Sequence, residues 1–114
     1  MGSNILSDHY FHNGTTVTGN GEEMNVQNFS DTLEVEMMTD GTATIYFEGE
    51  GKLGVWRPLL GTKLTSPLSM MTSVAITSAV EPFYQFDVSG INKARMRVSA
   101  TSGDPLYIYG KILG

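Results

Sequence analysis

Residues 32–49 read TLEVEMMTDGTATIYFEG, and this stretch decides the fold class. On both sides of its centre, apolar and polar residues alternate with a period of two, which is the pattern of a half-buried β-strand. The TDG sequence at Thr39–Gly41 predicts a tight turn, because Asp and Gly tolerate the backbone angles that such turns require. We therefore expect Thr32–Met38 and Thr42–Gly49 to pair as a hairpin.

The same alternation returns in the last third of the chain. Strand patterns begin at Phe83 (FYQFDV), at Ala94 (ARMRVSA) and at Leu106 (LYIYGKIL). The TSGDP turn at residues 101–105 predicts a second hairpin between the last two segments. The residues expected on the outer face of this hairpin are Arg95, Arg97, Tyr107, Tyr109 and Lys111.

Weaker patterns fill the rest of the chain. Residues 22–28 alternate, Trp56 lies in a short strand before a proline, and the Ser, Thr and Met-rich stretch 61–79 is expected to be a long loop with one strand at Ser73–Thr77. Many short strands with no helical pattern predict an antiparallel β-sandwich or jelly-roll-like barrel of about seven to nine strands.

The composition bounds both size and chemistry. A chain of 114 residues with 40% apolar residues and thirteen glycines suits one domain of short strands and tight turns. The lack of cysteine excludes a disulfide framework, a thiolate zinc site and a cysteine nucleophile. The formal net charge of −5 argues against nucleic acid as a partner, because phosphate binding requires a clustered basic face. No apolar run approaches the roughly 18 residues of a membrane helix, so we expect no membrane partner.

The first segment differs from the others. Residues 1–12 are expected to form an N-terminal arm, and residues 13–114 a single β-sandwich domain, because NILSDHYFHN has no clean period. The arm is too apolar for a free tail, so it should dock either on this domain or, as we favour, on a neighbouring subunit. Its docking residues would be Ile5, Leu6, Tyr10 and Phe11. The pair Met70 and Met71, in a segment without period, is a further candidate for an intersubunit contact.

Two patterns have a possible chemical interpretation. His9 and His12, with Asp8 beside them, have a spacing that can share a metal, but two imidazoles do not make a site, and an ordinary docking segment is the expected alternative. The chain has neither a G-x-S-x-G nucleophile motif nor a phosphate-binding loop.

Three carboxylates also fall into a pattern. If the first hairpin forms, Glu34, Glu36 and Glu48 share one polar face, where paired carboxylates could serve as acid and base, although a solvated surface is the simpler interpretation. We expect no enzymatic activity, no catalytic or metal-binding residue and no cofactor.

The order of segments resembles small structural proteins of tailed bacteriophages. The quoted segments are NGTTVTGNGEEMNV, then LEVEMMTDGTATIYFEGEGKLGVWRPL, then YQFDVSGINKARMRVSATSGDPLYIYGKILG. In the phage pattern a strand ending in FEG leads through a Gly-rich turn to a Trp, and a later DVSG precedes an Arg-rich strand, a Ser-Gly turn and a last strand with YGK. The resemblance covers most of residues 13–114, although GEGKLGVW lacks the Asp-Gly that often stands before the Trp.

This resemblance implies a function. Such domains occur in capsid decoration proteins, head fibres, and tail or baseplate accessories, and they bring no catalytic residue with them. We therefore expect a homo-oligomer in the virion, assembled in the host cytoplasm, that binds other virion proteins such as the major capsid protein. The candidate interface residues are Ile5, Leu6, Tyr10, Phe11, Met70, Met71, Arg95, Arg97, Tyr107, Tyr109 and Lys111.

A carbohydrate-binding or receptor-binding module of a phage tail is the alternative. It would stack sugar rings on a strip of exposed aromatic side chains, and a buried Trp would count against it. The residues of that strip would be Tyr46, Trp56, Tyr107 and Tyr109.

Overall fold

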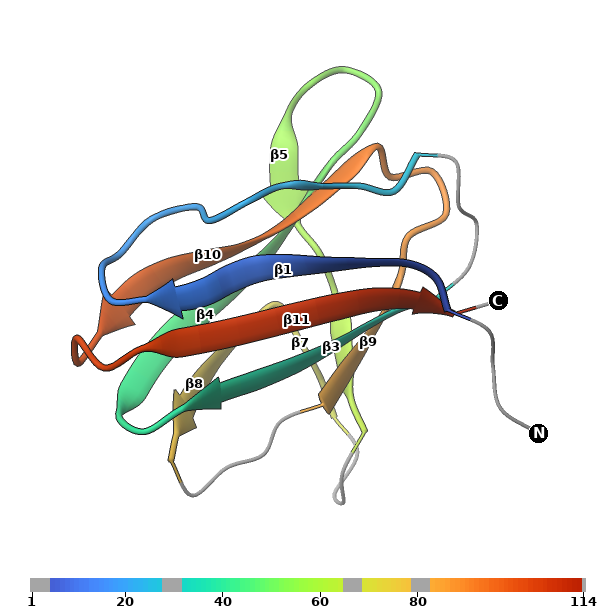
Figure 1. The fold of residues 1–114 in the computed structure, drawn as a ribbon. Helices are drawn as coiled ribbons and strands as arrows, with labels where there is room; N and C mark the ends of the chain where they lie inside the picture. Colours follow the sequence, from blue (N-terminus) through green and yellow to red (C-terminus); the bar gives the residue numbers. More distant parts are fainter. Residues whose placement is uncertain (1–4, 28–31, 65–68, 79–82, 114) are drawn as a thin grey trace.

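The computed structural model describes residues 5–27, 32–64, 69–78 and 83–113. These residues form eleven strands and no helix, and the strands lie in two antiparallel sheets that face each other (Figure 1). The predicted all-β antiparallel sandwich is confirmed, although the described residues form eleven strands instead of about seven to nine. Seven of the strands have five or more residues, and the other four are pairing segments of two or three residues.

The first sheet has six strands and contains both ends of the described chain. Its order is β1(Ile5–Thr15), β11(Leu106–Leu113), β3(Thr32–Thr39), β9(Phe83–Asp87), β6(Gly61–Lys63) and β7(Met70–Met71). The second sheet has five strands, with the order β2(Met24–Asn25), β10(Lys93–Thr101), β4(Thr42–Glu50) and β5(Trp56–Pro58), and with β8(Ser73–Thr77) also paired to β4.

The two predicted hairpins do not form. The turn after Thr39 joins β3 to β4, and the turn after Thr101 joins β10 to β11, but in each case the two strands belong to opposite sheets. The alternating pattern does mark the strands and their buried faces. It does not distinguish a turn within one sheet from a turn that crosses to the other sheet, because a crossing turn buries both apolar faces as well, by placing them opposite each other across the core.

The two crossing turns stabilise each other. The backbone N–H of Thr42 donates to Oγ of Ser102 at 3.0 Å, and the N–H of Ser102 donates to the carbonyl of Thr42 at 2.9 Å. A Cβ atom at Gly41 would collide with the side chains of Ser102 and Asp104. The glycine of the TDG sequence is therefore needed for the close approach of the second turn.

One core lies between the sheets. Alternate residues of β3 and β4 are buried as their period predicts, and Phe47 of β4 packs against Tyr84 and Phe86 of β9 with ring centroids 5.4 and 4.9 Å away. Gly110 of β11 has no room for a side chain, since a Cβ there would lie 2.5 Å from the ring of Phe11. This places Phe11, from the predicted arm, within the core.

The structure differs from the predicted arm over residues 5–12. These residues belong to β1, which pairs with β11 along its length, so the segment is an edge strand of this domain rather than a separate arm. An irregularity between Tyr10 and His12 turns both Phe11 and His12 inward, and this break in the alternation is the reason that the sequence shows no clean period. Residues 1–4 lie outside the described residues.

Candidate functional site

The predicted Arg, Tyr and Lys face is divided between two surfaces. Arg95 and Arg97 lie on β10 in the five-stranded sheet, whereas Tyr107, Tyr109 and Lys111 lie on β11 in the six-stranded sheet. Because their side chains point away from the core, the two groups are on opposite outer faces of the sandwich. The structure therefore offers two separate candidate surfaces.

The outer face of the five-stranded sheet carries an arginine cluster. Oε1 of Glu48 accepts hydrogen bonds from Nε of Arg95 at 2.9 Å and from Nε of Arg97 at 3.2 Å. The Arg95 guanidinium lies 4.0 Å from the ring centroid of Trp56, and the Arg97 guanidinium lies 4.7 Å from the ring centroid of Tyr46. An aromatic ring therefore ends the cluster on each side.

The charges of the arginine cluster are matched internally. Burial raises the pKa of Glu48, but the hydrogen bonds and charges of Arg95 and Arg97 outweigh it, so that the pKa lies below its usual value. Each guanidinium has both an aromatic face and a carboxylate, which are the two kinds of partner that it prefers. The cluster stabilises this sheet and leaves little for a ligand to pair with.

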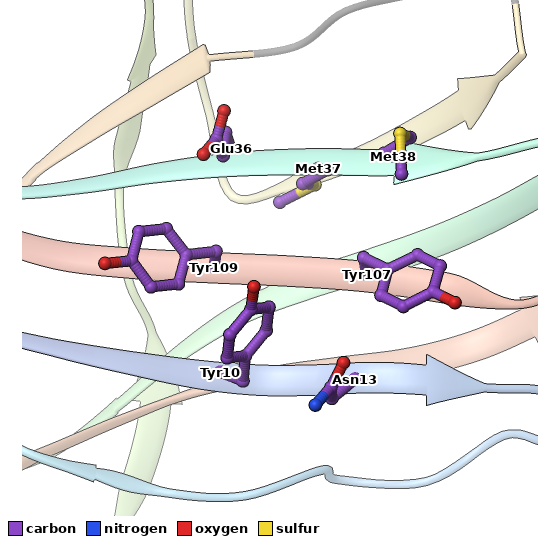
Figure 2. A pocket seen from close by; sticks show the side chains of 7 residues that line it. All are labelled: Tyr10, Asn13, Glu36, Met37, Met38, Tyr107 and Tyr109. Carbon is purple, nitrogen blue, oxygen red and sulfur yellow. The ribbon is translucent and has the colours of Figure 1, made fainter.

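The outer face of the six-stranded sheet carries a groove instead. Tyr10 of β1 is opposite Tyr109 of β11, which in turn is opposite Glu36 of β3. The rings of Tyr10 and Tyr109 touch, with centroids 5.0 Å apart, and Figure 2 shows Tyr10 between Tyr109 and Tyr107. The groove has a volume of about 390 Å³. We call it the tyrosine groove, and its lining residues are Tyr10, Asn13, Glu36, Met37, Met38, Tyr107 and Tyr109.

The tyrosine groove is electronegative. The hydroxyl of Tyr109 donates to Oδ2 of Asp8 at 2.6 Å, and this hydrogen bond, with the nearby negative charges of Asp8 and Glu36, raises the pKa of Tyr109 to about 12. Glu36 is exposed and has no ion pair or hydrogen bond among the described residues. Lys111 lies opposite Asp8 on one side and Glu34 on the other, and its Nζ is 3.7 Å from Oε1 of Glu34. Among the described residues, no Lys or Arg lines the groove.

The apolar surface continues beyond the groove. Phe83 of β9 is opposite Glu36, and Met70 of β7 extends the same sheet further. Met38 and Met70 are 62% and 63% exposed, whereas Met71 packs against the core. Of the two predicted methionine contacts, Met70 is therefore the one on the outer surface.

The other predicted residues have different positions. Phe11 is fully buried and cannot contact a partner, and the side chains of Ile5 and Leu6 lie outside the described part of the chain. Glu34 and Glu36 lie on one sheet and Glu48 on the other, so the expected face of three carboxylates does not exist.

The two histidines do not face each other as metal ligands would. Nε2 of His12 donates to the carbonyl of Met96, and Nδ1 accepts from the Thr15 hydroxyl at 2.9 Å. Nε2 of His9 donates to the carbonyl of Glu22 at 3.1 Å. Within the described ranges, no three His, Cys, Asp or Glu side chains form a metal-binding group, and no helix there is long and apolar enough to span a membrane.

Three residues of the tyrosine groove and one projecting loop were not predicted from the sequence. Asn13, Glu36 and Met38 join the tyrosine groove only through the register of β1, β11 and β3, which no local pattern reveals. The loop between β4 and β5 projects from the sandwich in Figure 1 and exposes 86% of Leu53. The signal for it was a leucine between glycines in GKLG.

Comparison with known proteins places this sandwich in a family. The sequence model of the XepA family matches residues 6–112. The chain belongs to the XepA family. No curated protein matches it in sequence.

Two solved structures have the same fold as this XepA-family chain. One is the SPBc2 prophage-derived protein YomS, with 23% identity and a TM-score of 0.83 over 95% of this chain and 92% of that chain. The other is the PBSX exported protein XepA, with 21% identity and a TM-score of 0.85 over 95% of this chain but only 37% of that chain. Both are prophage proteins by name, and with the family match they support the expected relation to bacteriophage proteins.

Proposed function

We propose that this chain is a structural protein of a bacteriophage particle, of the capsid decoration or head-fibre type, and that it acts by binding proteins rather than by catalysis. Its place would be in the virion, after assembly in the host cytoplasm. Membership of the XepA family and the fold shared with two prophage proteins support the phage relation.

One observation carries the proposed mode of action. The outer face of the six-stranded sheet exposes Tyr10, Met38, Met70, Phe83 and Tyr107, with between 37% and 63% of each side chain accessible. Aromatic residues and methionine are enriched where protein interfaces are anchored. In contrast, the two arginines and the two aromatic rings of the arginine cluster on the opposite face are already paired with each other and with Glu48. We infer that partners bind on the six-stranded sheet.

Repeated copies would make weak contacts sufficient. A decoration protein meets many equivalent positions on a symmetric particle, so a homo-oligomer gains affinity by avidity even if each contact is modest. The partners in this proposal are further copies of the chain and a virion protein such as the major capsid protein.

The carbohydrate alternative required one strip of exposed aromatic side chains, and the structure does not bring its four residues together. Tyr46 and Trp56 lie on the five-stranded sheet, and Tyr107 and Tyr109 on the other. In addition, Arg97 covers one face of Tyr46, and Arg95 covers one face of Trp56. The four rings therefore cannot stack one sugar chain.

The test is whether the protein is part of the particle. Phage particles purified by density gradient are analysed by quantitative mass spectrometry, and we expect this chain in a fixed ratio to the major capsid protein. A second arm adds purified protein to particles that lack it and measures co-sedimentation. If the protein stays in the lysate or the medium and does not bind such particles, the proposal is wrong.

A further inference from the structure

Both outer faces of the sandwich carry tyrosine rings next to a glutamate, but only the face of the five-stranded sheet has arginines beside them. On the five-stranded sheet, Tyr46 and Glu48 of β4 together hold the guanidinium of Arg97, through a ring 4.7 Å away and a carboxylate oxygen 3.2 Å away. On the six-stranded sheet, the tyrosine groove combines three tyrosine rings with the carboxylate of Glu36. The groove has the aromatic faces and the anion of the first site, but it has no arginine.

The charge around the groove favours a cation. Glu36 has no basic partner among the described residues, and Asp8 lies at the edge of the groove with its carboxylate on the Tyr109 hydroxyl. The raised pKa of Tyr109 is a further sign of negative potential at this position. The chain as a whole has a formal charge of −5, which favours a partner that presents basic side chains.

We propose that the tyrosine groove binds an arginine side chain of another protein, with the guanidinium against the rings of Tyr10 and Tyr107 and paired with Glu36. This rests on the proposed function, since it names the chemistry that a protein partner presents to this face. Arginine fits better than lysine because its planar guanidinium stacks on a ring while it donates two parallel hydrogen bonds to a carboxylate. The groove volume of about 390 Å³ leaves room for the side chain and its flanking backbone.

The test compares two peptides that differ only at one side chain, where a charged guanidinium is replaced by a neutral urea group. A short peptide with a central arginine is titrated into the isotope-labelled protein, and the same peptide with citrulline, the neutral isostere, is titrated in parallel. We expect NMR shifts at Tyr10, Glu36 and Tyr107 with the arginine peptide, and about tenfold weaker binding of the citrulline peptide.

Matched variants locate the site. Glu36→Gln should weaken arginine binding by about tenfold, whereas Glu50→Gln, which makes the same charge change on the opposite sheet, should leave it unchanged. Tyr107→Leu keeps an apolar side chain but removes the ring, and it should also weaken binding. Both groove residues are surface residues, so the spectra of the free variants will show whether the fold is retained.

Several results would overturn the assignment. These are equal affinity for the two peptides, shifts outside the groove, no shifts up to the solubility limit of the peptide, or the same residues shifting with a neutral oligosaccharide. If concentrated protein alone shifts the groove resonances and Arg57→Gln abolishes this, the occupant is a second copy, because Arg57 is the one arginine outside the arginine cluster. If the chain is found on particles but fails these titrations, the arginine assignment is wrong while the proposed function still stands.

Discussion

His12 connects the two sheets by a hydrogen bond that requires a proton on Nε2. Its Nε2 donates to the carbonyl of Met96 across the core while its Nδ1 accepts from Thr15, which is the neutral tautomer with the proton on Nε2. Burial lowers the pKa of His12, although the hydrogen bond to Met96 acts in the opposite direction. The native state therefore takes up its proton at a lower pH than the unfolded chain does.

This lowered pKa predicts acid sensitivity. The stabilisation from neutral His12 is complete above the unfolded pKa of about 6.5 and is lost as the pH falls from there through the lower native value, because the unfolded state then binds more protons. Urea unfolding at a series of pH values should give a falling free energy of unfolding below about pH 6.5. His12→Gln should reduce this slope. An identical slope in the variant would show that another group is responsible.

The hydrogen bond between Asp8 and Tyr109 predicts how the pKa of the Tyr109 hydroxyl depends on the Asp8 carboxylate. In Asp8→Asn, the Tyr109 hydroxyl loses a charged acceptor, so its pKa should fall from about 12 towards 10. The measurement is an NMR titration of the Tyr109 ring, with Tyr107 in the same spectra as an internal comparison. If the pKa of Tyr109 stays near 12, the hydrogen bond is not its cause.

At the scale of elements, the arginine cluster joins β4, β10 and β5. Glu48→Gln keeps the shape of the side chain but leaves Arg95 and Arg97 without their shared carboxylate. Because the side chains of Arg95 and Glu48 are only 14% and 16% exposed, we expect a loss of about 1–2 kcal/mol in the free energy of unfolding. Urea unfolding measures this loss.

A looser ion pair on the other sheet is the control for Glu48. Nζ of Lys111 is 3.7 Å from Glu34, and both side chains are more exposed than those of Arg95 and Glu48. Lys111→Gln should therefore cost less than about 0.5 kcal/mol. Equal losses in the two variants would contradict a special contribution of the arginine cluster.

The strands were predictable from the sequence, but their grouping was not. The period of two located β3, β4, β10 and β11 and their buried residues, because burial of one face is a local requirement. A turn sequence such as TDG fixes a reversal of the chain, and that reversal can lie within a sheet or between sheets. Arg97 and Tyr109 were therefore expected on one surface, although the structure places them on opposite sides.

The candidate site depends even more on long-range pairing. The tyrosine groove needs Tyr10 from one end of the chain beside Tyr109 from the other, with Glu36 opposite. Tyr10, Tyr107 and Tyr109 were individually predicted as contact residues, but Glu36 was interpreted as a solvated carboxylate, or as one of a set of acid and base groups, and not as a contact residue. The irregularity at Tyr10–His12 also hid the strand that carries the first tyrosine.

At the scale of the whole molecule, the two outer faces predict where copies of the chain meet. The six-stranded sheet also exposes apolar side chains outside the tyrosine groove, so the double variant Met70→Glu with Phe83→Glu should abolish self-association by placing two charges in the contact. Met70 and Phe83 are 63% and 37% exposed, and the new carboxylate at residue 83 would lie opposite Glu36, so we expect a lower melting temperature with the fold retained. Sedimentation velocity should then show an oligomer for the wild type and a monomer for the variant.

The control for this variant is another exposed apolar residue. Val17→Glu changes a side chain that is 67% exposed and belongs to none of the strands of the six-stranded sheet, so the oligomer should persist. If the double variant remains an oligomer, the contact lies elsewhere, and the projecting Leu53 loop is then the next surface to change. A wild-type protein that sediments as a monomer at every concentration would contradict the homo-oligomer, and the particle lattice alone would then have to supply the avidity that the proposed function requires.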